Sequence, residues 1–135
     1  MSAPSLRRFT HLSLSVRDLQ ASLAFYHGVM GLPVFRDTYQ GEAFDGREAM
    51  LLVGGMALCL QEHGANPGEP HDPRRSGLDH VAFAVEALDG LESWAATLTD
   101  HGVEHSGVKP LPGFGYFIET RDPDGILVEL HCMPG

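Results

Sequence analysis

The sequence is poor in basic residues, and it contains no long apolar run. Its 135 residues include 9 Lys and Arg against 18 Asp and Glu, which gives a formal net charge of −9. Because tracking a nucleic-acid backbone or an anionic membrane surface needs positive charge, we expect no nucleic-acid and no membrane partner. No stretch is apolar for long enough to span a bilayer, and the N-terminus reaches Phe9 without a signal-peptide core. The sequence therefore predicts a cytoplasmic protein.

Cysteine is also scarce. Cys59 and Cys132 are the only two in the chain, too few for a disulfide framework. A chain of this length suits one domain, and its 43% hydrophobic and 20% charged residues are ordinary for a globular protein. We therefore expect residues 1–135 to form a single folded domain.

An internal repeat organises this domain. Residues 10–16 align with residues 79–85, and each segment has a histidine in second place and a valine in last place. Residues 55–60 align with residues 125–130, and each begins with a glycine followed by an apolar strand. The chain therefore contains two copies of one structural plan.

The limits of the two modules follow from the repeat and from the residues between its copies. Residues 63–77 are rich in Pro and Gly, so they form neither a helix nor a central strand. The sequence predicts a first module over about residues 8–62, a connector over 63–77 and a second module over about 78–132.

Each module is predicted to contain one amphipathic helix. In the first, Asp18 is placed to cap the helix and Gly31 to end it; in the second, Asp89 and Gly102 are the candidates. Apolar residues recur at helical spacing between these limits. They are Leu19, Leu23, Tyr26 and Met30 in the first helix, and Leu91, Trp94, Ala95 and Leu98 in the second.

The end of the chain has the pattern of a hairpin. Asp122–Gly125 carries Asp, Pro and Gly where a type I turn favours them, between strands predicted near 115–121 and 126–132. Each module thus has the order strand, helix and three strands. Since neither small module buries a sheet face alone, we expect the two to pack together within the chain or across a homodimer.

The repeat also brings together three possible metal ligands. His11 and His80 occupy equivalent strand positions, as do Cys59 and Glu129. Pseudo-symmetry therefore predicts that two histidines and a carboxylate converge. Such a set, with positions left open, suits a divalent metal such as Fe²⁺, Mn²⁺ or Zn²⁺. We predict a metal at His11, His80 and Glu129; the alternative for each histidine is a hydrogen-bonded structural role.

Four further side chains share these strand faces and are the candidate substrate contacts. Cys59 is either a small buried structural residue or a fourth ligand. Gln61 lies on the same face and is a weaker ligand candidate. His131 shares the face of Glu129 and is either a proton carrier or a structural residue. The substrate-contact set is Ser13, Cys59, Gln61 and His131.

Three segments carry a resemblance to a known superfamily. Residues 9–19 read FTHLSLSVRDL, residues 78–85 read LDHVAFAV, and residues 121–130 read RDPDGILVEL. Together they resemble the signature strands of the vicinal oxygen chelate superfamily, which includes glyoxalase I, bleomycin resistance proteins, fosfomycin resistance enzymes and extradiol dioxygenases. The resemblance implies an α+β fold in which two βαβββ modules form a cup-shaped mixed sheet. It also implies metal ligands at the predicted histidines and carboxylate.

Two positions depart from the patterns of individual families. Glyoxalase I enzymes normally place a Glu or Gln ligand where this sequence has Cys59, so a three-ligand site is the leading form. Dioxygenases and fosfomycin enzymes usually place a Tyr ten residues before the carboxylate ligand, where this sequence has Glu119. The resemblance therefore leaves the reaction class open.

The residues and the resemblance together predict a metal-dependent enzyme acting on a small oxygen-bearing substrate. The metal would bind vicinal oxygens and stabilise developing negative charge as a Lewis acid. Dioxygenase chemistry, an oxidoreductase reaction, needs Fe²⁺ and dioxygen, whereas lyase or isomerase chemistry needs a base, for which Glu129 is the catalytic candidate. The alternative is a metal-free protein that sequesters a drug, as bleomycin resistance proteins do.

Overall fold

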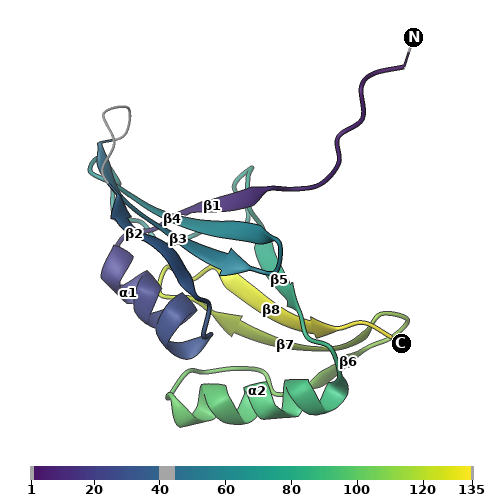
Figure 1. The fold of residues 1–135 in the computed structure, drawn as a ribbon. Coiled ribbons are helices and arrows are strands. Elements are labelled where there is room, and N and C mark those ends of the chain that lie inside the picture. Colours follow the sequence, from purple (N-terminus) through teal and green to yellow (C-terminus); the bar gives the residue numbers. More distant parts are fainter. Residues whose placement is uncertain (1, 40–44, 135) are drawn as a thin grey trace. The chain divides into compact units, whose positions relative to one another are not determined.

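The computed structural model describes residues 2–39 and 45–134, and the chain divides into two compact units, Met1–Gly68 and Glu69–Gly135. Each unit has the predicted order of one strand, a helical segment and three strands (Figure 1). Each also has one four-stranded sheet with parallel and antiparallel neighbours. The predicted α+β class with two βαβββ modules is confirmed. Within the described ranges, no helix is both long enough and apolar enough to cross a membrane.

The first unit is built on a sheet of order β1-β4-β3-β2, in which β1 and β4 are parallel. The buried residues of this sheet are mostly apolar. They are Leu14 of β1, Ala49 and Leu51 of β3, and Leu58, Cys59 and Leu60 of β4. The helix α1 contacts β3 and β4. The elements are β1 (His11–Ser15), α1 (Leu19–Leu23), the π-helical η1 (Ala24–Val29), β2 (Val34–Tyr39), β3 (Gly46–Val53) and β4 (Met56–His63).

The limits of the first helical segment are those expected. The Asp18 side chain accepts hydrogen bonds from the backbone N–H groups of Gln20 and Ala21, which satisfies two of the donors that a helix start leaves free. Gly31 has a φ of 73°, the left-handed conformation in which helices commonly end. The predicted cap and stop are both confirmed.

The second half of this segment differs from the predicted α-helix. The backbone N–H of Met30 bonds to the carbonyl of Phe25 at 2.9 Å, which closes a turn wider than an α-helical one. Leu19, Tyr26 and Met30 of the predicted stripe are buried. Phe25 and Tyr26 are both buried, whereas Leu23, part of the predicted stripe, is only half-buried.

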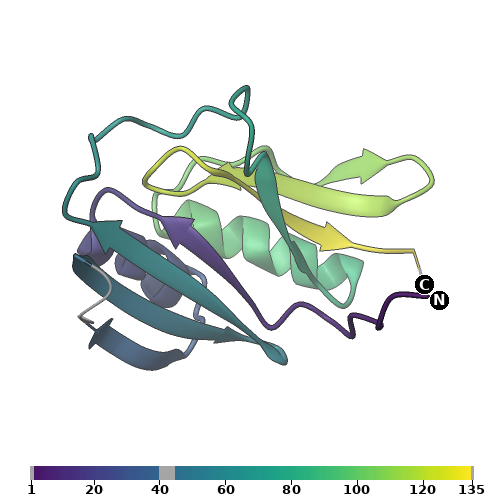
Figure 2. The ribbon, with the colours of Figure 1, turned by 90° about the horizontal axis from the view of Figure 1, so that it is seen from above.

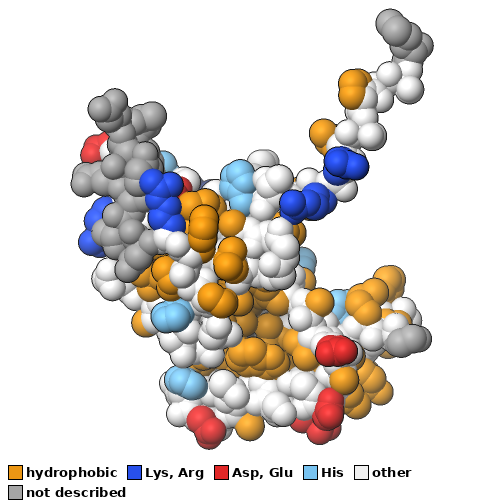
Figure 3. Space-filling view, in the orientation of Figure 1, with side chains coloured by type: hydrophobic (Ala, Val, Ile, Leu, Met, Phe, Trp, Pro, Cys, Tyr) orange, Lys and Arg blue, Asp and Glu red, His pale blue; other side chains and the backbone are white. Residues whose placement is uncertain are grey.

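The segment before β1 is exposed. Leu6 is 100% and Phe9 79% exposed, and Figure 3 shows basic and apolar side chains along this stretch. Arg8 donates from Nη1 to the carbonyl of Gly55 at 2.9 Å. This bond ties the end of the segment to the turn between β3 and β4.

The second unit repeats the plan with a sheet of order β5-β8-β7-β6, in which β5 and β8 are parallel. The helix α2 lies along one face and contacts β7 and β8 (Figure 2). The elements are β5 (His80–Ala84), α2 (Leu88–Asp100), β6 (Lys109–Leu111), β7 (Gly115–Arg121) and β8 (Leu127–Cys132). The buried side chains include Val81, Leu91, Leu98, Ile118, Val128 and Leu130.

The N-cap of α2 is not the predicted residue. The N-cap is Ala87, which has no side-chain cap, and Asp89 lies in the first turn. The predicted cap at Asp89 is wrong because the backbone enters the helix two residues earlier. In the first turn, the carboxylate of Asp89 still interacts favourably with the positive end of the helix dipole.

The predicted hairpin turn is confirmed and strongly hydrogen-bonded. The N–H of Gly125 bonds to the carbonyl of Asp122 at 3.0 Å. The Asp122 carboxylate accepts from the backbone N–H groups of Asp124 and Ile126, each at 2.9 Å. Asp122 and Asp124 are both buried. This turn fixes how β8 enters the sheet and therefore where Glu129 lies.

Gly115, at the start of β7, is held where only glycine fits. Its φ is 93°, and a Cβ there would collide with the carbonyl oxygen of Cys132. Gly115→Ala should therefore lower the free energy of unfolding by more than about 1 kcal/mol. Gly113 is the matched control, because its φ is 83° but nothing lies within 4 Å of its Cβ position. Urea unfolding measures both variants, and equal losses would show that the collision has no cost of its own.

Candidate functional site

The second unit brings two predicted ligands into contact. Glu129 of β8 pairs in register with Ala82, two residues after His80, so the side chains of His80 and Glu129 share one face of the sheet. His80 Nε2 lies 2.9 Å from Glu129 Oε2. The imidazole is 40% exposed and the carboxylate 17% exposed. The pair is therefore preformed and still accessible to a ligand.

A second carboxylate contacts the same imidazole. Asp79, directly before β5, places Oδ1 2.8 Å from Nδ1 of His80. Both ring nitrogens of His80 therefore face carboxylate oxygens. Asp79 is not among the residues predicted from the sequence. Its position immediately before a predicted ligand is the signal that could have identified it.

The first unit arranges His11 in a similar way. Its Nδ1 lies 2.9 Å from the hydroxyl of Thr10, which leaves Nε2 as the nitrogen for a further partner. Thr10 precedes His11 as Asp79 precedes His80, so each predicted histidine ligand has an oxygen partner on the same ring nitrogen. The repeat thus extends from the strands to the side-chain hydrogen bonds.

The pairing register of the parallel strands is also the same in the two units. Cys59 pairs with Ser13, two residues after His11, as Glu129 pairs with the residue two places after His80. Cys59 and Glu129 therefore occupy equivalent strand positions. This equivalence is the geometric basis on which the sequence pattern predicts convergent ligands.

Cys59 is placed as a buried thiol. Burial raises its pKa, a hydrogen bond with Ser13 opposes this increase, and the charge of Glu48 raises the pKa further. Because a metal ligand or nucleophile must be the thiolate, these surroundings favour the inert form.

Gln61 is held by a carboxylate that the sequence pattern did not identify. Its Nε2 donates to Glu48 Oε2 at 2.7 Å, and the two residues are directly opposite each other on β4 and β3. The amide oxygen of Gln61 is then the atom left to accept a bond from a substrate.

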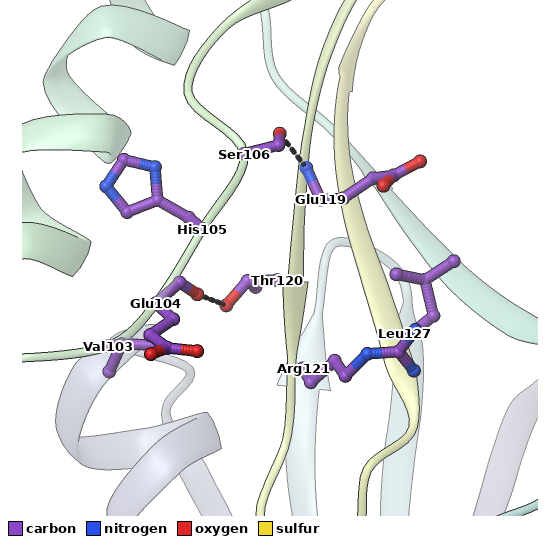
Figure 4. A pocket seen from close by; sticks show the side chains of 8 residues that line it. All are labelled: Val103, Glu104, His105, Ser106, Glu119, Thr120, Arg121 and Leu127. Atoms are coloured by element: carbon purple, nitrogen blue, oxygen red, sulfur yellow. Dashed lines mark hydrogen bonds between the residues drawn. The ribbon is translucent and has the colours of Figure 1, made fainter.

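Two other polar residues flank Glu129. His131 Nε2 lies 2.6 Å from the backbone carbonyl of Phe114, so this nitrogen donates a hydrogen bond that orients the ring. Glu119 of β7 lies directly opposite Glu129, and Figure 4 shows its carboxylate directed away from Ser106. Two carboxylates opposite each other on neighbouring strands are unfavourable, and a bound cation would relieve that repulsion.

A cavity of about 470 Å³ lies beside the end of β7 (Figure 4). The Thr120 hydroxyl donates to the carbonyl of Glu104 at 2.8 Å, and the N–H of Glu119 donates to Ser106 Oγ at 3.0 Å. None of the predicted ligands or substrate contacts lines this cavity. Its lining residues are Val103, Glu104, His105, Ser106, Glu119, Thr120, Arg121 and Leu127.

The described residues of either unit alone supply few ligands for a metal. Among the residues described within either unit, no three His, Cys, Asp or Glu side chains come together as a group able to hold a metal. His80 and Glu129 supply two donors, whereas a catalytic metal centre typically has three protein ligands.

Comparisons with known proteins cover nearly the whole chain. The family model described as the Glyoxalase/Bleomycin resistance protein/Dioxygenase superfamily matches residues 8–130. Glutathione transferase FosA from Serratia marcescens is 32% identical over 126 residues, which cover 93% of this chain and 81% of that protein. Metallothiol transferase FosB from Bacillus licheniformis is 32% identical over 123 residues, which cover 90% and 72%.

A solved structure gives the same result for the fold. The glyoxylase/bleomycin resistance protein/dioxygenase domain from Frankia sp. EAN1pec superposes with a TM-score of 0.86 at 30% sequence identity. The match covers 96% of this chain and all of that domain. The βαβββ order of both units is therefore shared with a domain of similar length.

Proposed function

Because the chain belongs to the glyoxalase/bleomycin resistance protein/dioxygenase superfamily, we propose that it is a divalent-metal-dependent enzyme acting on a small substrate with neighbouring oxygen atoms. The observation that carries the proposal is the 2.9 Å contact between His80 and Glu129. An imidazole nitrogen and a carboxylate oxygen at this separation suit first-row metals such as Fe²⁺, Mn²⁺ and Zn²⁺.

His11 is the proposed third ligand. It occupies the position in β1 that His80 occupies in β5, and its Nδ1 is already bonded to Thr10. Its Nε2 is therefore the donor atom, as it is in His80. We propose that this third donor comes from the partner chain of a homodimer, so that one chain alone does not complete the site.

The residues around the ligands have separate roles in this proposal. When bound, the metal would act as a Lewis acid toward the substrate oxygens. Glu129 holds the metal and is the candidate base for a proton on the substrate. His131 is oriented by the carbonyl of Phe114, and the amide of Gln61 by Glu48. With Ser13 and Cys59, these two side chains are the proposed substrate contacts.

The comparisons support metal-dependent chemistry without selecting one reaction. One relative is a glutathione transferase and another is a metallothiol transferase, and the family description includes dioxygenases. Glu119 lies directly opposite the proposed carboxylate ligand, at the position where dioxygenases and fosfomycin enzymes usually have a tyrosine. Oxygenation and lyase or isomerase chemistry therefore both stay within the proposal.

Metal stoichiometry tests the proposal, and Cys59 provides the matched variant. Protein purified without chelator should bind about one divalent metal per chain. Cys59→Ala should bind the same amount, because the buried thiol is not a ligand, whereas His11→Ala should lose most of it. Elemental analysis after dialysis measures all three proteins.

The possible results lead to different conclusions. Negligible metal in the wild-type protein would contradict the enzyme proposal and favour a metal-free sequestering protein. A folded Cys59→Ala variant that loses metal as severely as His11→Ala would make Cys59 a fourth ligand, which is typical of zinc.

A further inference from the structure

The residue before each proposed histidine ligand carries the oxygen that bonds its Nδ1 atom. For His80 this oxygen belongs to the carboxylate of Asp79, at 2.8 Å. For His11 it belongs to the hydroxyl of Thr10, at 2.9 Å. The two partners occupy equivalent positions but differ chemically, because an ionised carboxylate only accepts hydrogen bonds whereas a hydroxyl also donates them.

We propose that Asp79 is a positioning residue that keeps the N–H of His80 on Nδ1 and thereby directs Nε2 toward the metal. This inference rests on the proposed function, because it assigns a role to a residue behind a proposed ligand. Metal-binding histidines commonly donate their other ring N–H to a carboxylate, which fixes both the tautomer and the ring orientation.

Glu129 and Asp79 contact opposite nitrogens of the His80 ring. Glu129 lies at Nε2 of His80 while Asp79 lies at Nδ1. In a neutral imidazole only one nitrogen carries hydrogen, so the two carboxylates compete for it. When Asp79 holds the N–H, the lone pair of Nε2 and the oxygens of Glu129 are both available to one cation.

Thr10 provides a built-in comparison. Its hydroxyl is able to bond either tautomer of His11, so it does not select one.

The Asp79 carboxylate is 70% exposed, and water therefore replaces part of its hydrogen bond when it is removed. We expect a loss of about 10-fold in metal affinity for Asp79→Ala, at the lower end of what outer-sphere partners contribute, and a smaller loss for Thr10→Val.

The affinity experiment uses the full chain and Zn²⁺ in competition with a chromophoric chelator. Asp79→Asn is the conservative variant, because its amide oxygen still accepts a hydrogen bond at the same place. Asp79→Asn should recover most of the affinity that Asp79→Ala loses. An Asp79→Asn protein as weak as Asp79→Ala would overturn the proposal, as would an unchanged affinity in Asp79→Ala. Thermal unfolding of each metal-free protein confirms that the variants are folded.

A second readout does not depend on metal binding. Long-range ¹H–¹⁵N correlation spectra of the metal-free protein, recorded at alkaline pH where imidazoles are neutral, show which nitrogen of His80 carries hydrogen. Asp79→Ala should carry less of this hydrogen on Nδ1 than the wild-type protein does, and more of it on Nε2, where Glu129 accepts. The same distribution in the two proteins would overturn the role of Asp79. The expected shift in a protein that binds no metal would support that role and contradict the proposed function instead.

Discussion

Replacing Glu129 by alanine should weaken divalent-metal binding by more than about 100-fold, because a direct ligand contributes more than the roughly 10- to 100-fold effect of outer-sphere partners. The variant also removes the oxygen that lies 2.9 Å from His80 Nε2. Titration of the metal-free protein with Mn²⁺, followed by the electron paramagnetic resonance signal of the free ion, measures the loss.

Glu119→Ala is the matched control for this experiment. Glu119 lies directly opposite Glu129 on the neighbouring strand, so its removal deletes the same charge without deleting a proposed ligand. It should therefore change Mn²⁺ affinity far less than Glu129→Ala does. Equal losses in the two variants would mean that Mn²⁺ responds to the acidic surface in general, and an undiminished affinity in Glu129→Ala would remove Glu129 from the site.

Mixing two defective chains should restore metal sites, if His11 of one chain completes the pair of the other. His11→Ala and Glu129→Ala chains, unfolded and refolded together in equal amounts, should recover roughly a quarter of the wild-type sites. This fraction follows because about half of the dimers are mixed and each mixed dimer has one intact site of its two. Each variant refolded alone should recover none.

Native mass spectrometry of the refolded mixture verifies that mixed dimers are present. Sedimentation that shows only monomers would contradict the shared site. Verified mixed dimers that bind no metal would do the same, and either result would place the three ligands within one chain.

The element order could be predicted because two sequence signals agreed. The repeat set the order of elements, and strand alternation set which side chains share a face, so the contact between His80 and Glu129 follows from residue parity and the parallel pairing of β5 with β8. The same reasoning gave the turn at Asp122–Gly125, whose hydrogen bonds depend on residue types at fixed spacing.

Features that depend on backbone detail could not be predicted in this way. The apolar pattern does not distinguish the π-helical segment after Leu23 from an α-helix, and Phe25, which lies outside the predicted stripe, is buried there. The position of the N-cap of α2 depends on where the backbone enters the helix. The N-cap is Ala87, and Asp89 lies in the first turn. Asp79 precedes β5, so strand parity does not describe its side chain.

Anomalous diffraction from crystals grown with Mn²⁺ tests the proposed metal site most directly. We expect one strong manganese peak per chain, bonded to Nε2 of His11, Nε2 of His80 and a carboxylate oxygen of Glu129. Metal-replete crystals whose manganese peak lies elsewhere, or that show no peak at these three side chains, would contradict it.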